Sequence, residues 1–234
     1  MILPPIWLRH LIKKRLGLAS QHNEAITLVN GQKVVFVRIP KTGTTSITTL
    51  LGWEPDKHFV HCYDQAGNII DKPAIHPKTC PHQSLTMVKE YVFPLTFSRA
   101  YKVSFVRNPW DRMLSQYNYF VKINHSQLQE CPIPFTQWLD YVLGPTKHPD
   151  YYHTPLWYQP QFDWLSLDGE TLGVDFVGKF ETLAEDWAVV ARELDLPTEL
   201  PHLNKSGASS GRKPYQDAYN DYTRQLVAKV YEKD

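Results

Sequence analysis

Residues 34–51, VVFVRIPKTGTTSITTLL, place a lysine, a glycine and several hydroxyl side chains directly after an apolar run. The β-branched stretch at 34–37 predicts a short buried strand, and apolar residues at helical spacing in 47–51 predict a helix after the loop. Such a loop can bind a phosphate-like anion, because unpaired backbone N–H groups and the helix dipole favour negative charge at a helix start. Gly43 would let the backbone approach the anion closely, and Lys41 would add a full positive charge.

The order of residues in this loop differs from that of the nucleotide-hydrolysing P-loop, which has the form GxxxxGK[ST]. Lys41 precedes the only glycine of the loop, and neither GKS nor GKT occurs in the chain. This argues against a nucleotide-dependent kinase or phosphotransferase, which would need ATP and magnesium. That enzyme class stays open as an alternative, as do a non-catalytic nucleotide-binding protein and ordinary polarity in a surface turn.

Two further segments combine positive charge with hydroxyl groups. Residues 101–106, YKVSFV, predict a second buried strand that Arg107 ends, and Asn108 with Pro109 predicts a helix start. Ser115 lies off the apolar stripe of that helix, so Arg107 and Ser115 can both face the carboxyl edge of the sheet. The stripe consists of Trp110, Met113, Leu114, Tyr117, Phe120 and Val121. The third segment, 204–213, contains Lys205, Ser206, Arg212 and Lys213. Taken singly, these features also fit an ion pair, a surface serine and a solvated turn.

The composition limits the class of protein. The 234 residues include 25 basic and 24 acidic side chains, a net charge of +1, so no global field directs the chain to nucleic acid or to a membrane. Three cysteines are too few for a disulfide framework or a zinc site, and no apolar run reaches the length of a transmembrane helix. We therefore expect a single α/β domain with a mostly parallel sheet flanked by helices, and with ligands at the carboxyl edge of its strands.

Local patterns predict the remaining elements. They indicate an N-terminal helical extension within 1–32, a hairpin at 53–71, helices at 84–91, 135–143, 182–194 and from about 215 onward, and a strand at 175–180. Thr182 and Glu185 have the spacing of a capping box. The long aromatic stretch 145–164 is predicted to be irregular, and it could form a lid or a surface that stacks on sugar rings. Core packing is the favoured role for half or more of these rings.

Four stretches together resemble the carbohydrate sulfotransferases, in particular the group related to the heparan and dermatan 2-O-sulfotransferases and their bacterial relatives. They are RIPKTGTTS at 38–46, FVRNPWDRMLSQY at 105–117, FVGKFETLAEDW at 176–187 and PHLNKS at 201–206. The resemblance covers most of residues 33–234, which we take as the sulfotransferase domain. It implies a P-loop-like three-layer sandwich, with a mostly parallel sheet between two layers of helices.

The resemblance also implies a donor, 3′-phosphoadenosine 5′-phosphosulfate, whose sulfuryl group passes to a hydroxyl and leaves 3′,5′-diphosphoadenosine. The expected acceptor is a saccharide. By resemblance, Lys41, Thr42, Gly43, Thr44, Thr45 and Ser46 hold the 5′-phosphosulfate, Arg107 and Ser115 hold the 3′-phosphate, and Ser206, Arg212 and Lys213 belong to a loop that closes over the adenosine. Lys41 would also stabilise the leaving oxygen in an in-line displacement. No metal is expected, because a sulfuryl group carries less charge than a phosphoryl group.

A base is needed for the acceptor hydroxyl, and His82 is the candidate, because related enzymes carry their catalytic histidine at this place. The 2-O-sulfotransferases have a second histidine two residues earlier, where this chain has Cys80. His76 is the second choice, and Glu54, Asp56 or another carboxylate could be the base instead. His82 would then only pack in the core or cap a helix. Animal members of the family are anchored in the Golgi membrane. The missing anchor suggests a cytoplasmic, bacterial-type enzyme, or else the Golgi-lumenal domain of a trimmed membrane protein.

Overall fold

A computed structural model of the chain describes residues 27–51, 82–92, 94–152, 155–200 and 214–234. Several predicted features lie outside these residues. They are the hairpin at 53–71, the alternative bases Glu54, Asp56 and His76, the substitution at Cys80, and the loop residues Ser206, Arg212 and Lys213.

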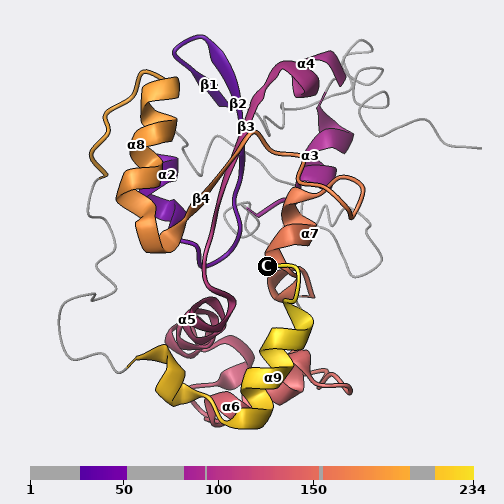
Figure 1. The fold of residues 1–234 in the computed structure, drawn as a ribbon. Coiled ribbons are helices and arrows are strands. Elements are labelled where there is room, and N and C mark those ends of the chain that lie inside the picture. The colour runs from indigo at the N-terminus through magenta and orange to yellow at the C-terminus, as the bar shows by residue number, and fades with distance from the viewer. Residues whose placement is uncertain (1–26, 52–81, 93, 153–154, 201–213) are drawn as a thin grey trace, which may run out of the picture.

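The described residues form one four-stranded sheet in the order β1-β2-β3-β4 (Figure 1). The strands are β1 (Thr27–Val29), β2 (Gln32–Val37), β3 (Tyr101–Val106) and β4 (Phe176–Lys179). β1 pairs with β2 in antiparallel orientation, whereas β2 with β3 and β3 with β4 are parallel pairs. Val34 lies opposite Tyr101 and Val103 opposite Phe176, so the carboxyl ends of the parallel strands share one edge of the sheet.

Helices cover both faces of the sheet (Figure 1). On one face lie α2 (Thr44–Leu50) and α8 (Leu183–Glu193), and on the other lie α3 (Leu85–Tyr91), α4 (Pro94–Arg99) and α7 (Gln161–Leu165). The side chains of the strands alternate between the two faces, because successive residues of a strand point to opposite sides. The first face buries Val34, Val103, Ile47 and Trp187 together, and the second buries Val35, Val37, Leu85 and Trp164. The predicted α/β three-layer sandwich is therefore confirmed.

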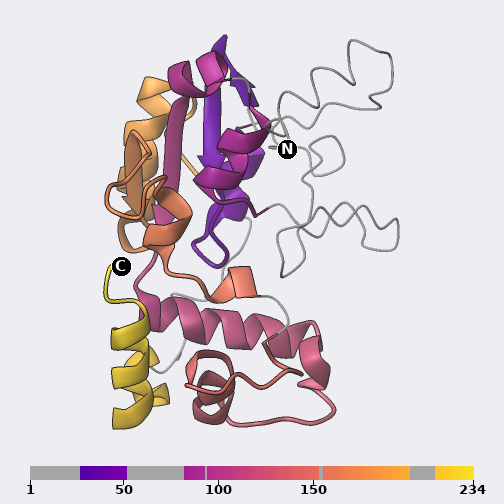
Figure 2. The same cartoon turned by 90° about the vertical axis from the view of Figure 1, so that its right-hand side faces the viewer.

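A helical layer lies beyond the carboxyl edge of the sheet. It contains α5 (Pro109–Lys122), α6 (Phe135–Leu143), α9 (Asp221–Val230) and the 3-10 turns His125–Gln127, Pro155–Tyr158 and Tyr215–Ala218. α5 passes directly beneath the sheet, between its edge and the other helices (Figure 2). One side of α5 packs into an aromatic core with Phe135, Trp138 and Tyr158, while its other side is turned to the strand ends.

The helix starts agree with the sequence in two of three places. The Ser84 hydroxyl accepts a hydrogen bond from Met87 N and caps α3, and the Asn108 side chain accepts from Trp110 N and Asp111 N and caps α5. The predicted capping box at Thr182 is wrong, because its hydroxyl instead donates to the Asp186 carboxylate at 2.8 Å. Asp186 also accepts from Lys179 N at 2.7 Å, which ties the start of α8 to the end of β4.

Two other expectations need correction. Residues 27–29, which lie within the predicted helical extension 1–32, form β1 and extend the sheet through β2. Within 145–164, predicted to be irregular, the structure has a 3-10 turn and most of α7, and Trp164 is fully buried in the core. No helix in the described part of the chain is both long and apolar enough to cross a membrane.

Candidate active site

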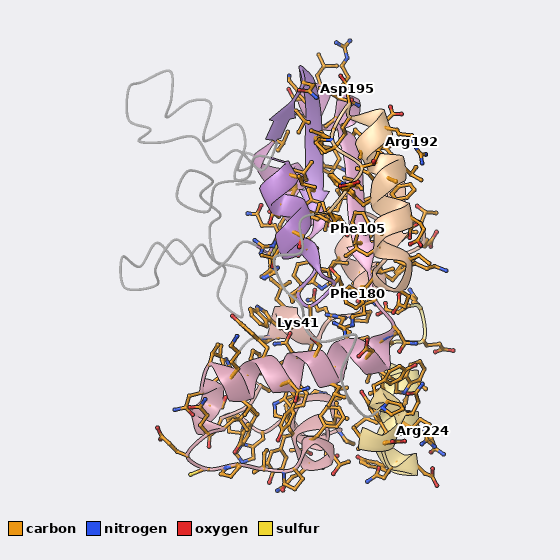
Figure 3. The ribbon with its side chains drawn as sticks, turned by 90° about the vertical axis from the view of Figure 1, so that its left-hand side faces the viewer. Lys41, Phe105, Phe180, Arg192, Asp195 and Arg224 are labelled. Carbon is orange, nitrogen blue, oxygen red and sulfur yellow. The ribbon has the colours of Figure 1, made fainter. Side chains whose placement is uncertain are left out.

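Three loops meet where the parallel strands end. Lys41 follows β2, Arg107 follows β3, and Phe180 follows β4. The Arg107 guanidinium donates from Nη1 to the Lys41 carbonyl at 3.1 Å, and it lies over the Phe180 ring at 4.1 Å from the centroid. Asn108 N donates to the Glu181 carboxylate at 2.7 Å, which joins the β3 and β4 loops. Lys41 and Phe180 both lie at the level where the sheet meets α5 (Figure 3).

The loop from Lys41 to Ser46 is held by its own side chains. Lys41 and Gly43 both have positive φ, 69° and 75°, a conformation that costs little only for glycine. The Thr42 hydroxyl is fully buried and donates to the Ile39 carbonyl at 3.0 Å, so a contact of Thr42 with a ligand would come from its backbone N–H. Arg38 donates from Nε to the Thr44 hydroxyl at 3.3 Å. Thr45 is exposed and Ser46 is half-buried.

Replacing Gly43 with alanine should destabilise this corner of the fold. A Cβ at Gly43 would lie 2.7 Å from the Phe180 ring, and the positive φ adds backbone strain. We expect the free energy of unfolding to fall by about 1–3 kcal/mol for Gly43→Ala, measured by urea denaturation. Gly169→Ala is the matched control, because Gly169 has φ +80° but nothing within 4 Å of its added Cβ. If both variants lose the same stability, the contact with Phe180 contributes nothing.

Arg107 is fixed from several directions. Nε and Nη2 donate to the Asp111 carboxylate at 2.9 and 2.7 Å, one turn along α5. The Gln161 side chain bridges the backbone of Arg107, accepting from its N–H at 2.9 Å and donating to its carbonyl at 2.8 Å. With the bond to Lys41, three of the five guanidinium N–H groups are engaged, which leaves two for another acceptor.

The side of α5 that faces the strand ends carries three residues of note. Arg112, 1% exposed, donates to the Pro40 carbonyl at 3.4 Å and to the carbonyls of Trp157 and Gln159, both at 3.2 Å. Tyr119 lies two turns further on. Ser115 is half-buried and is spaced three residues from Arg112 and four from Tyr119, so it shares their side of the helix. The structure thus brings this α5 side to the lysine loop.

The electrostatics of the loop favour an anion. Burial, followed by the neighbouring charges of Arg107 and Lys122, lowers the pKa of Lys41 to about 8. Burial likewise lowers the pKa of Arg38 to about 10. Among the carboxylates in the described ranges, only that of Asp111 pairs with Lys41, Arg107 or Arg112. Cations gathered with so little compensation repel one another, and a bound anion would relieve that repulsion.

His82 lies next to the same loop. Its Nδ1 is 2.7 Å from the Arg38 carbonyl, which can only accept, so Nδ1 carries the proton and the lone pair of the neutral ring is on Nε2. Burial, and then the charges of Arg38, Lys41 and Arg112, lower the pKa of His82 to about 3. The ring meets Trp157 edge-on at 5.5 Å and Trp164 at 6.5 Å between centroids. At neutral pH the imidazole is therefore uncharged.

Most of the predicted site residues thus lie near the same strand ends: the loop 41–46, Arg107 and His82 by their contacts, and Ser115 by its helical spacing from Arg112. Ser206, Arg212 and Lys213 lie outside the described residues. Sequence reasoning missed Arg38, Arg112 and Tyr119; the helical spacing of the last two from Ser115 was the available signal. Within the described ranges, no group of histidine, cysteine and acidic side chains is arranged to hold a metal ion.

The chain has similarity to known proteins at the level of the family and of one solved structure. No curated protein sequence is significantly similar to the chain. The crystal structure of a sulfotransferase from Alicyclobacillus acidocaldarius is similar at 18% sequence identity and a TM-score of 0.41, covering 83% of this chain and 92% of that one. The model of the sulfotransferase family matches residues 25–234. Since this match spans the lysine loop, Arg107, α5 and β4, the chain belongs to the sulfotransferase family.

Proposed function

We propose that the protein transfers the sulfuryl group of 3′-phosphoadenosine 5′-phosphosulfate to a hydroxyl group, with a saccharide as acceptor. One observation carries this proposal more than any other: the Arg107 guanidinium bonds the Lys41 carbonyl, so two cationic segments 66 residues apart in the chain form a single site. A ligand with anionic groups at two ends can engage both segments. Family membership supports the reaction type.

The residues present fit the donor. Lys41 and the loop N–H groups with Thr45 and Ser46 suit the 5′-phosphosulfate, which needs positive charge and several hydrogen-bond donors. The two remaining N–H groups of Arg107 suit the 3′-phosphate, and Ser115 lies on the same side of α5 as Asp111, the partner of Arg107. Phe180 covers one face of the guanidinium, so a phosphate would approach its edge, where the N–H groups point.

The chain's own groups divide the chemical work. When bound, the donor supplies a sulfuryl group that is already activated by its link to phosphate. The Lys41 ammonium provides positive charge where the departing oxygen becomes negative, and the loop donors stabilise charge on the remaining oxygens. His82 takes the proton of the acceptor hydroxyl at Nε2, while the Arg38 carbonyl holds Nδ1–H and fixes the ring. Burial of Lys41 and His82 limits access of water to both groups.

A pKa of about 3 makes His82 a weak base in the donor-free protein, and this low value comes first from burial and then from the charges of Arg38, Lys41 and Arg112. A bound polyanion offsets the charges of Arg38, Lys41 and Arg112, and so raises the pKa of His82 toward its ordinary range. His82 is therefore a stronger base with the donor bound than without it, although burial continues to lower its pKa. His82 thus stays unprotonated in the empty site, and binding of the donor increases its basicity.

The direct test measures transfer of radioactive sulfur from labelled donor to a panel of saccharides, with product identified by mass. Sulfated product from the wild-type protein, without added ATP or magnesium, supports the proposal. Tight binding of 3′,5′-diphosphoadenosine with no transfer to any hydroxyl acceptor would instead support a non-catalytic nucleotide-binding protein. Phosphorylated product with ATP and magnesium would support a kinase.

The assignment of Arg107 to the 3′-phosphate gives a separate prediction. Arg107→Ala should raise the Kd for 3′,5′-diphosphoadenosine about 10- to 100-fold, because a charge-assisted hydrogen-bond set is lost. The Kd for adenosine 5′-monophosphate, which lacks the 3′-phosphate, should change less than about threefold. Calorimetric titration of both nucleotides measures the difference. Equal losses for the two nucleotides would show that Arg107 acts through the Lys41 loop and not on the 3′-phosphate.

A further inference from the structure

Tyr119 contacts the amino group of Lys41 although the two residues belong to different layers of the fold. The Lys41 Nζ lies 4.2 Å from the centroid of the Tyr119 ring. That distance is within the range in which a ring face attracts an ammonium ion. Tyr119 is half-buried near the end of α5.

The Tyr119 ring is also connected to His82, the candidate base, through the ring of Trp157. Tyr119 stacks on Trp157 with 6.0 Å between centroids and 19° between planes, and Trp157 meets the His82 ring at 5.5 Å and 74°. Arg112 fixes this arrangement from behind, since its guanidinium bonds both the Trp157 carbonyl and the Pro40 carbonyl next to Lys41. A continuous set of packed groups thus connects the lysine to the histidine.

We propose that Tyr119 is a positioning residue, whose ring face holds the Lys41 ammonium and whose stack on Trp157 sets the placement of Lys41 relative to His82. The inference rests on the roles given to Lys41 and His82 in the proposed function. It adds a reason for an aromatic ring at this position of α5.

Compared with a carboxylate, an aromatic ring can hold the Lys41 ammonium without cancelling its positive charge. A lysine side chain is a flexible stem with four rotatable bonds, and no carboxylate in the described ranges pairs with Lys41 to hold it. A carboxylate partner would fix the ammonium but would cancel much of its field. The quadrupole of an aromatic face attracts the ammonium without adding a net negative charge, so the field stays available to an anion.

The test replaces Tyr119 with phenylalanine and then with mono-, di- and trifluorophenylalanine, incorporated at position 119. Fluorine weakens the attraction of the ring face for a cation while the ring volume changes little. The first readout is the pKa of the Lys41 amino group, followed by NMR of lysine labelled with ¹³C in the donor-free protein, with the signal assigned by Lys41→Arg. The second readout is kcat for sulfuryl transfer.

We expect the pKa of Lys41 to fall stepwise with each added fluorine, because the charged form loses stabilisation. Over the same series kcat should fall about 3- to 30-fold, while Tyr119→Phe itself stays within about threefold of wild type. The matched control places the same fluorinated residues at position 120. Phe120 also stacks on Trp157, at 5.3 Å, but has no contact with Lys41. There both readouts should stay flat.

Each other outcome has a clear meaning. A Lys41 pKa that is constant across the series overturns the proposed contact, whatever the activity. A falling pKa with constant or rising kcat overturns the positioning role, because the ring then holds Lys41 in a place that does not serve the reaction. If the wild-type and Tyr119→Phe proteins transfer no sulfuryl group at all, the proposed function fails, and the NMR series still decides the contact by itself.

Discussion

Lys41→Ala should lower kcat for sulfuryl transfer by about 10³-fold or more, because it removes the cation that we propose stabilises charge on the departing oxygen. The loss should exceed the change in affinity for 3′,5′-diphosphoadenosine, since Arg107 and the loop donors remain in place. Single-turnover assays at saturating donor measure the effect on the transfer step separately from binding. The fold itself should survive, because Lys41 is a half-buried cation without a carboxylate partner in the described ranges.

Lys89→Ala is the matched control for this variant. Lys89 is an exposed lysine on α3, away from the strand ends, and its replacement should leave kcat unchanged. Lys41→Arg separates charge from geometry, because it keeps a cation but changes the position of the N–H groups. A kcat for Lys41→Ala within tenfold of wild type would remove Lys41 from the catalytic role, although it could still bind the donor.

His82→Ala should lower kcat by about 10²- to 10⁴-fold, the usual contribution of a general base. Affinity for the donor and for 3′,5′-diphosphoadenosine should stay near wild type, because His82 bonds the Arg38 carbonyl, a group that is not assigned to donor binding. His148→Ala is the control, since His148 is a partly exposed histidine near α6 and outside the site. Loss of donor affinity in step with rate would assign His82 to donor binding instead.

The pH dependence has a defined sign. In the donor-free protein the pKa of His82 is lowered to about 3, by burial and then by cations. The donor is an anion, and it favours the protonated ring, so the acid limb of the kcat profile should lie at a higher pH than the pKa of His82 measured without donor. His82→Ala should abolish that limb. An acid limb that persists in the variant would identify another group as the base.

The sequence was a good guide where local patterns decide the structure. The strands at 34–37 and 101–106 and the helix starts at Ser84 and Asn108 follow from apolar runs and capping residues, and the structure confirms them. Helix 135–143 has the predicted bounds. That Lys41 and Arg107 would lie together also followed, because adjacent parallel strands end at the same edge.

The missed elements depend on partners far away in the chain. α7 has only five residues, and its first N–H groups donate to the Asp234 carboxylate, at 2.9 Å from Gln161 N and 2.9 Å from Phe162 N. No local pattern encodes a cap supplied 73 residues later. Arg112 was hidden for a similar reason: an arginine on an amphipathic helix usually faces water, and only the Pro40 and Trp157 carbonyls explain its burial.

The apolar stripe predicted for α5 describes only part of its buried surface, because Arg112 is buried against segments distant in the chain. Met113 and Phe120 are buried as expected, but Arg112 and Gln116 are buried too, on the side toward the strands. A helix placed between a core and a ligand site has two buried sides of different chemistry, and a pattern of apolar residues identifies only one of them.

The crowding of Lys41, Arg107 and Arg112, with Asp111 as their one acidic partner in the described ranges, has a practical consequence. Such a centre behaves as a trap for any small oxyanion in solution. Sulfate or phosphate buffers would therefore compete with the proposed nucleotide donor and mask weak ligands, whereas a bulky organic buffer would not. If the proposed function holds, release of 3′,5′-diphosphoadenosine should be slow, because among the described carboxylates only that of Asp111 pairs with these cations.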